Sequence, residues 1–167
     1  MIYKNQRVGV FVDVANMYHS AKNLYGANVN FAKILEEATS GRQVIRALAY
    51  VIRSKSKEEQ GFFDAIAKQG FEVKIKDLQI FPGGMKKADW DVGIAIDMIK
   101  ISEMLDVVVL VSGDGDYIPA IEYIQNHGRL VEVIAFGETT SSKLIEKADH
   151  FVDLSKNKKK FLIKRNF

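Results

Sequence analysis

The sequence predicts an α/β fold in which a parallel central sheet carries helices on both faces. Two short apolar runs rich in Val, at residues 7–14 and 106–112, read as strands buried on both faces, as central strands of a parallel sheet are. Helical stretches separate the strand-like runs along the chain, and this alternation is typical of right-handed βαβ units. The 167 residues suffice for one domain with a sizeable core.

Five segments have the composition of strands, and helical segments lie between them. The expected strands are residues 7–14, 43–52, 71–78, 106–112 and 130–136. The expected helices are residues 15–25, 30–40, 56–70, 89–105, 116–127 and 141–148, and residues 79–88 are expected to form a loop.

Local signals justify several of the helix boundaries. Gly26 ends the first helix, and Asn30 and Gly41 bracket the second as its cap and its stop. The third helix opens on a capping box, in which Glu59 follows Ser56 by three residues. Pro119 falls in the first turn of the fifth helix, where its missing N–H costs nothing.

The composition excludes several kinds of chemistry. The chain has no Cys, which excludes disulfides and Cys-based zinc or redox sites, and this fits a reducing cytoplasm. His19, His127 and His150 are scattered, which argues against a His-based zinc site. The longest apolar stretches have the length of strands, so we expect neither a signal peptide nor a membrane span.

The charge is uneven along the chain. Residues 155–167 hold six of the 24 Lys and Arg and no acid, which leaves a slightly acidic body. We therefore expect one domain at residues 1–154 and a basic C-terminal tail at residues 155–167. The tail either keeps the protein soluble or contacts a nucleic-acid backbone.

Aspartates follow the two strands that we expect at the centre of the sheet. Asp13 closes the first strand, and Asp114 and Asp116 follow the strand that ends at Ser112. If the two strands are neighbours, ligands bind beyond their carboxyl ends, at the point where the strand order reverses. Asp91, in the first turn of the helix at 89–105, can reach the same edge.

Several neighbouring aspartates repel one another, and a divalent cation relieves the repulsion. Carboxylates without His or Cys favour Mg²⁺ or Mn²⁺, which activate water and stabilise a phosphoryl transition state. Asn16, three residues after Asp13, could orient water or a phosphate without adding charge. Each residue alone also has a structural explanation, since Asp116 could cap a helix and Asp114 could serve a turn.

Basic and aromatic residues fall near the same edge in the sequence. Arg53 and Lys55 follow the second strand, Lys86 and Lys87 precede the helix that carries Asp91, and all four could neutralise substrate phosphates. Tyr18, Trp90 and Tyr117 could stack on unpaired bases or belong to the core. Asp97 is a lesser candidate, for which we expect a pairing with Lys100 or a supporting role.

Three segments resemble the NYN family of PIN-like nucleases, most nearly its LabA-like branch. They are "VFVDVAN", "KKADWDVGIAIDM" and "VVLVSGDGDYIPAI", in the family's order, and the resemblance extends over residues 7–153. It implies a three-layer PIN-like α/β/α sandwich with strand order 3-2-1-4-5. It also implies that Asp13, Asp91, Asp114 and Asp116 bind metal with support from Asn16, that Lys87 faces substrate, and that Asp97 matches a frequently acidic position.

The leading hypothesis is a metal-dependent ribonuclease that hydrolyses phosphodiester bonds of RNA, with single-stranded RNA as a candidate substrate, although the chemistry does not exclude DNA. The alternative is a non-catalytic RNA-binding or regulatory domain, and a homodimer is left open. A nucleotide-cofactor site at "GDGDYI" is disfavoured, because Ile118 replaces the third Gly and the two acids repel a pyrophosphate. An aspartyl phosphatase would want an acid at position 15, where this chain has Ala15.

Overall fold

The computed structural model of the chain describes residues 2–54 and 58–164, with only the backbone of Lys87. Its centre is a parallel sheet of six strands in the order β4-β3-β1-β7-β8-β9. The strands are β1 (Arg7–Asp13), β3 (Gln43–Arg53), β4 (Glu72–Asp77), β7 (Val107–Val111), β8 (Leu130–Ala135) and β9 (His150–Asp153).

The predicted strand order is confirmed for the five expected strands and extended by one. In chain order the first five strands of this sheet lie as 3-2-1-4-5, with β1 paired to β3 on one side and to β7 on the other. The expectation of five strands was incomplete, because β9 adds a sixth beside β8. The strand order reverses between β1 and β7, where we placed the ligand-binding edge.

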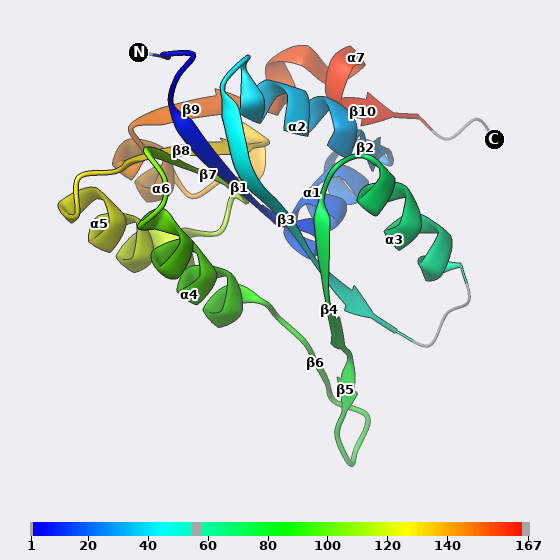
Figure 1. Cartoon of the computed structure of the whole chain (residues 1–167). Coiled ribbons are helices and arrows are strands. Elements are labelled where there is room, and N and C mark those ends of the chain that lie inside the picture. Colours follow the sequence, from blue (N-terminus) through cyan, green and yellow to red (C-terminus); the bar gives the residue numbers. More distant parts are fainter. Residues whose placement is uncertain (1, 55–57, 165–167) are drawn as a thin grey trace.

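Helices cover both faces of the sheet and give the three layers that the sequence predicts (Figure 1). On one face lie α1 (Val14–Tyr25), α2 (Phe31–Thr39) and α3 (Glu59–Lys68), whose apolar side chains share a core with Val8, Val10 and Val12 of β1. On the other lie α4 (Asp91–Ser102), α5 (Ile118–Asn126) and α6 (Ser142–Lys147), which pack on Phe11 and Leu110. The apolar run in β1 is therefore buried on both sides.

The segment expected as a loop at residues 79–88 contains a small hairpin instead. β5 (Gln79–Ile80) pairs antiparallel with β6 (Lys86–Lys87), and the hairpin extends away from the body (Figure 1). Pro82, Gly83 and Gly84 form its tip, and both glycines have positive φ. The strands are too short to give a periodic signal, which is why the sequence read as a loop.

The basic segment after residue 154 folds onto the body as far as residue 163. It forms the 3₁₀ turn η3 (Leu154–Asn157), the short helix α7 (Lys158–Phe161) and the strand β10 (Leu162–Ile163). β10 pairs antiparallel with β2 (Asn28–Val29), and Phe161 is buried in the core. The domain boundary at residue 154 stays a prediction.

Across residues 2–54 and 58–164, the structure contains no helix with the length and hydropathy that a membrane crossing requires.

Candidate metal and active site

Three elements bring the predicted aspartates to one edge of the sheet. Asp13 is the last residue of β1, and its carboxylate caps α1 by accepting a hydrogen bond from the backbone N–H of Asn16 at 3.2 Å. Asp114 caps the 3₁₀ turn η1 (Gly115–Tyr117) that follows β7, and accepts from the backbone N–H of Asp116 at 2.9 Å. Asp91 is the first residue of α4. The capping roles thus coexist with the convergence of the acids.

Asp91, Asp114 and Asp116 form a group that could hold a metal ion. Each offers one carboxylate oxygen, and these three oxygens lie within 4.8 Å of one another. Asp91 and Asp114 are half-buried and Asp116 is exposed, so the group opens to solvent on one side. An all-oxygen donor set of this kind suits hard cations such as Mg²⁺ and Mn²⁺.

Asp13 lies deeper than the other acids and connects to them through Tyr117. Tyr117 Oη lies 3.0 Å from Asp13 Oδ2 and 3.2 Å from Asp91 Oδ1, so one hydroxyl bridges two carboxylates. Only 7% of Asp13 is exposed, and this burial raises the pKa of its carboxyl, although hydrogen bonds from Asn16 and Tyr117 oppose the rise.

The pKa of Asp91 reflects how close the acids lie to one another. Burial, followed by the negative charges of Asp114 and Asp13, raises the pKa of Asp91 to about 6. A carboxyl with this pKa bears a destabilised negative charge at neutral pH, because it is partly buried and its neighbours repel it. A cation between these groups would remove that repulsion, so the electrostatics agree with the donor set.

The sequence left two roles open for Asn16, which were to orient a water or phosphate or to support the metal ligands. The Oδ1 of Asn16 accepts a hydrogen bond from the backbone N–H of Gly113 at 3.1 Å, and so joins the start of α1 to the loop after β7. Ser112 adds a second link, since its Oγ lies 3.5 Å from Asp13 Oδ2 and accepts from the N–H of Asp114 at 3.2 Å. Both side chains hold the loop that presents Asp114.

The two glycines of this loop are needed because the chain of residues 139–141 passes close by. A Cβ at Gly113 would lie 3.1 Å from the Cα of Thr140, and one at Gly115 would lie 3.1 Å from the Cβ of Ser141. Because the first contact is with the backbone, no side-chain rotation can relieve it. Small residues at 113 and 115 therefore let the loop pack against its neighbour and fix the direction of Asp114.

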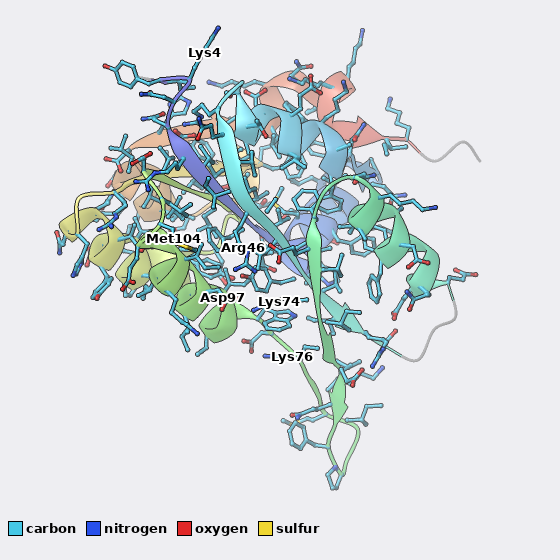
Figure 2. All side chains as sticks on the ribbon, viewed as in Figure 1. Lys4, Arg46, Lys74, Lys76, Asp97 and Met104 are labelled. Atoms are coloured by element: carbon cyan, nitrogen blue, oxygen red, sulfur yellow. The ribbon has the colours of Figure 1, made fainter. Side chains whose placement is uncertain are left out.

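Asp97 stands apart from the other acids and pairs with a different lysine from the one expected. Its Oδ2 accepts from Lys74 Nζ of β4 at 2.6 Å and from the Tyr50 hydroxyl at 2.8 Å, as Figure 2 shows for Lys74 and Asp97. Lys100 contributes only a Coulombic attraction, which lowers the pKa of Asp97. Although burial opposes ionisation, the hydrogen bonds from Lys74 and Tyr50 hold the pKa of Asp97 below its ordinary value.

The predicted basic residues are only partly described. Arg53, at the end of β3, forms an exposed ion pair with Asp77, with 2.8 Å between Nε and Oδ1. Lys86 lies exposed on the projecting hairpin, opposite Ile80. Lys55, like the predicted cap Ser56, lies outside the described residues, as does the side chain of Lys87.

For Tyr117 the sequence suggested base stacking or a core position, and it did not predict a contact with the acids. Tyr117 is 1% exposed, which rules out stacking on a base, yet its hydroxyl contacts two of the acids. Its position directly after Asp116 in the "SGDGDY" segment was the available signal. Trp90 donates its Nε1–H to the carbonyl of Val51 at 2.9 Å and packs edge-on against Tyr50.

Fold and site together define a PIN-like α/β/α domain with an acidic edge at its topological switch point. The family model described as "NYN domain" matches residues 7–155, and the chain belongs to the NYN family. The chain is similar to the low amplitude and bright protein LabA of Synechococcus elongatus, with 26% identity over 163 residues that cover 93% of this chain and 87% of LabA. The predicted resemblance to the LabA-like branch is thereby confirmed.

Two further relatives extend the comparison. The uncharacterised protein MJ0482 of Methanocaldococcus jannaschii is 25% identical over 150 residues, which cover 89% of this chain but only 55% of MJ0482. The crystal structure of VPA0982, a protein of unknown function from Vibrio parahaemolyticus, superposes with a TM-score of 0.87 at 34% identity, covering 98% of this chain and 99% of that one. The fold of this chain is therefore shared with a solved structure.

Proposed function

We propose that this protein is a ribonuclease that hydrolyses phosphodiester bonds of RNA with the help of Mg²⁺ or Mn²⁺. The observation that carries the proposal is the convergence of Asp91, Asp114 and Asp116, from two separate elements, within 4.8 Å at the sheet edge. Membership of the NYN family, related to PIN-like nucleases, supports the same chemistry.

The residues fit a hard divalent cation. Three carboxylates meet with one open side. Burial raises the pKa of Asp91 to about 6 together with repulsion from Asp114 and Asp13, and a cation relieves that repulsion. We assign Asp91, Asp114 and Asp116 as ligands, with Asp13 as a fourth acid. A bound ion of this type supplies positive charge for the phosphoryl transition state and makes a nearby water more acidic.

The rest of the site keeps the acids in place. Tyr117 fixes the spacing of Asp13 and Asp91 by contacting both, and Asn16 ties the loop of Asp114 to α1 through Gly113. Such positioning matters because an enzyme gains rate by holding its charges where the transition state needs them. We therefore class Asn16 as a positioning residue rather than one that touches the substrate.

The basic residues that the sequence singled out are proposed to hold the RNA backbone. Arg53 can contact a phosphate if its exposed ion pair with Asp77 breaks. Exposed pairs of this kind contribute little stability, so the exchange is easy. Lys55, Lys86 and Lys87 remain proposed phosphate contacts. A cytoplasmic location and a homodimer stay predictions.

The test is cleavage of an end-labelled single-stranded RNA by the purified protein, with Mg²⁺ or Mn²⁺ and with a chelator. We expect cleavage that requires the ion and is lost in Asp114→Asn, while circular dichroism of the variant stays unchanged. Asp64→Asn, which removes an exposed carboxylate from α3, is the matched control and should cut normally. A matching DNA strand tests whether the 2′-hydroxyl is needed.

If the protein binds RNA but never cuts it with either ion, the enzyme proposal is wrong. The alternative, a non-catalytic RNA-binding or regulatory domain, would then stand.

A further inference from the structure

The basic C-terminal segment forms one wall of a cavity with a volume of about 560 Å³. The cavity is lined by Tyr25, Ala27, Lys158, Lys159, Leu162 and Lys164. The first two come from the end of α1 and the residue before β2, and the other four from the segment that folds onto the body (Figure 1). The sequence left this segment open as a solubilising tail or a nucleic-acid contact, and neither the fold nor the acidic site explains it.

Several contacts hold the segment against the body. β10 pairs with β2, and Phe161 is buried in the core, where its carbonyl accepts from the backbone N–H of Asn30 at 2.8 Å. Lys160 Nζ lies 2.9 Å from Glu37 Oε2 of α2. A segment that served only solubility would need none of these contacts, and ordering it costs conformational entropy. The lysines of the cavity are therefore held at defined places.

The three lysines of the cavity form no ion pair with any carboxylate of residues 2–54 and 58–164. Lys158 Nζ lies 4.6 Å from the centroid of the Tyr25 ring, and this cation–π contact fixes one ammonium at the wall. Lys159 and Lys164 are exposed. Like charges around one concave surface repel one another and concentrate a positive potential, so an anion between them is favoured.

Two acids act on Tyr25, and both already have hydrogen-bond partners. Glu138 Oε1 accepts from the Tyr25 hydroxyl at 2.6 Å, and Asp153 accepts from the backbone N–H groups of Gly137 and Ser155 at 2.8 and 3.0 Å. Burial, followed by the hydrogen bond to Glu138, raises the pKa of Tyr25 to about 12, so its phenol stays neutral. Neither acid is among the described residues that line the cavity, which presents three positive charges.

The cavity and the acidic edge lie at opposite ends of α1. The helix begins directly after Asp13 and ends at Tyr25, and its 12 residues span about 18 Å along the axis. A second connection runs through Glu138, which contacts Tyr25 and is followed by residues 139–141. These residues pack against the loop that presents Asp114. An extended ligand bound at the acids could therefore continue to the lysines.

We propose that this cavity binds phosphate groups of the RNA strand that is cut at the acidic edge. In this form the inference rests on the proposed function. Lysine ammoniums are compact point charges that hold phosphates without reading sequence. Since the proposed function places an RNA strand at one end of α1, continuation of that strand to the other end accounts for both sites with one ligand.

The test is fluorescence anisotropy with a labelled single-stranded RNA of mixed sequence, in a chelator so that the strand stays intact. The double variant Lys158→Gln, Lys159→Gln removes two charges at exposed positions, and we expect it to bind about tenfold more weakly. The logarithm of the binding constant falls linearly with the logarithm of the salt concentration. The slope should decrease by about 0.7 for each phosphate contact that is lost.

Two further variants separate the role of the cavity from a general loss of charge or of structure. Lys4→Gln combined with Lys100→Gln is the matched control, since it removes two exposed lysines before β1 and on α4. Lys158→Arg combined with Lys159→Arg keeps both charges at the cavity. Both of these proteins should bind the RNA like the wild type.

Equal RNA binding by the wild type and the Lys158→Gln, Lys159→Gln variant, or no RNA binding by the wild type, would overturn the inference even if the protein cuts RNA. Tighter binding of the wild type to vesicles that contain phosphatidylserine than to RNA would also overturn it, because the lysines would then serve a membrane surface. Weaker binding of the Gln variant alone would support the inference. If that result came without any cleavage, the ribonuclease proposal would fail and the binding of RNA phosphates at the cavity would stand.

Discussion

The hydroxyl of Tyr117 lies 3.0 Å from the carboxylate of Asp13, although the two residues are 104 positions apart in the chain. Both are buried, and the same hydroxyl reaches Asp91 at 3.2 Å. Burial, with the charges of Asp13 and Asp91, raises the pKa of Tyr117, so the phenol stays protonated and can donate. One side chain from the η1 turn thus links the end of β1 to the start of α4.

We predict that Tyr117→Phe destabilises the protein while leaving its fold intact. The change removes the shorter of two side-chain hydrogen bonds to Asp13 Oδ2 and leaves only the 3.5 Å contact from Ser112, so we expect a loss of about 1–3 kcal/mol. Urea unfolding measures the loss. Tyr123→Phe, which removes an exposed hydroxyl from α5, is the control and should unfold like the wild type. Equal stability of all three proteins would show that the bridge contributes nothing.

Gly113→Ala should be strongly unfavourable, because the new Cβ would meet the backbone of Thr140 at 3.1 Å. We expect a loss of about 1–3 kcal/mol in urea unfolding, the usual cost of overpacking. The loop must also move, so Mn²⁺ affinity should fall with it.

Gly61→Ala is the matched control for this substitution. Gly61 lies in α3, and a Cβ there meets nothing within 4 Å, so alanine should stabilise the helix slightly. Tolerance of Ala at both positions would contradict the close approach of residues 139–141 to the loop.

Asn16→Ala should lower cation affinity without removing a proposed ligand. The amide oxygen of Asn16 holds the backbone N–H of Gly113, and its loss frees the loop that presents Asp114. Residues that support metal ligands typically affect affinity about 10–100-fold. Mn²⁺ titration measures the change, and Asn126→Ala at the end of α5 serves as control. Full affinity in Asn16→Ala would show that the loop holds its shape without this bond.

Lys74→Met should raise the pKa of Asp97, because Lys74 and Tyr50 together hold it below its ordinary value against the effect of burial. Because the pKa of Asp97 is lower in the folded protein than its unfolded value of about 3.9, its interactions stabilise the protein at pH values above about 3.9. This contribution is lost as the pH falls through the folded pKa. Lys74 is 42% exposed, so we expect a difference of about 1 kcal/mol or less at pH 7.

The measurement is carboxyl NMR titration of Asp97, combined with urea unfolding at pH 7 and pH 3. Lys100→Met is the control, and it should shift the pKa of Asp97 much less, since Lys100 forms no ion pair with it among the described residues. A stability difference that grows on acidification would contradict the assigned sign.

The sequence predicted the centre of the fold well, and the reason is physical. The apolar runs of β1 and β7 are short and rich in Val, which favours strands buried on both faces. An aspartate that ends such a strand lies at the sheet edge. The meeting of Asp91 with Asp114 and Asp116 follows from that placement. β9 escaped prediction because its four residues are half-exposed and too few to show a period.

The contacts between side chains could not be predicted in the same way. Asn16 accepts a hydrogen bond from Gly113, which lies 97 positions away in the chain. Asp97 pairs with Lys74 of β4 rather than with the nearby Lys100. Such choices depend on strand register and on the exact height of neighbouring helices, which periodicity does not determine.

The most direct test of the account is calorimetric titration of Mn²⁺ into the wild type, Asp91→Asn, Asp114→Asn and the control Asp64→Asn. If the acids at the sheet edge share one cation, the wild type and the control will bind Mn²⁺ saturably. Each edge variant will then bind at least about tenfold more weakly. Absence of binding to the wild type, or equal affinity in all four proteins, would contradict the metal site.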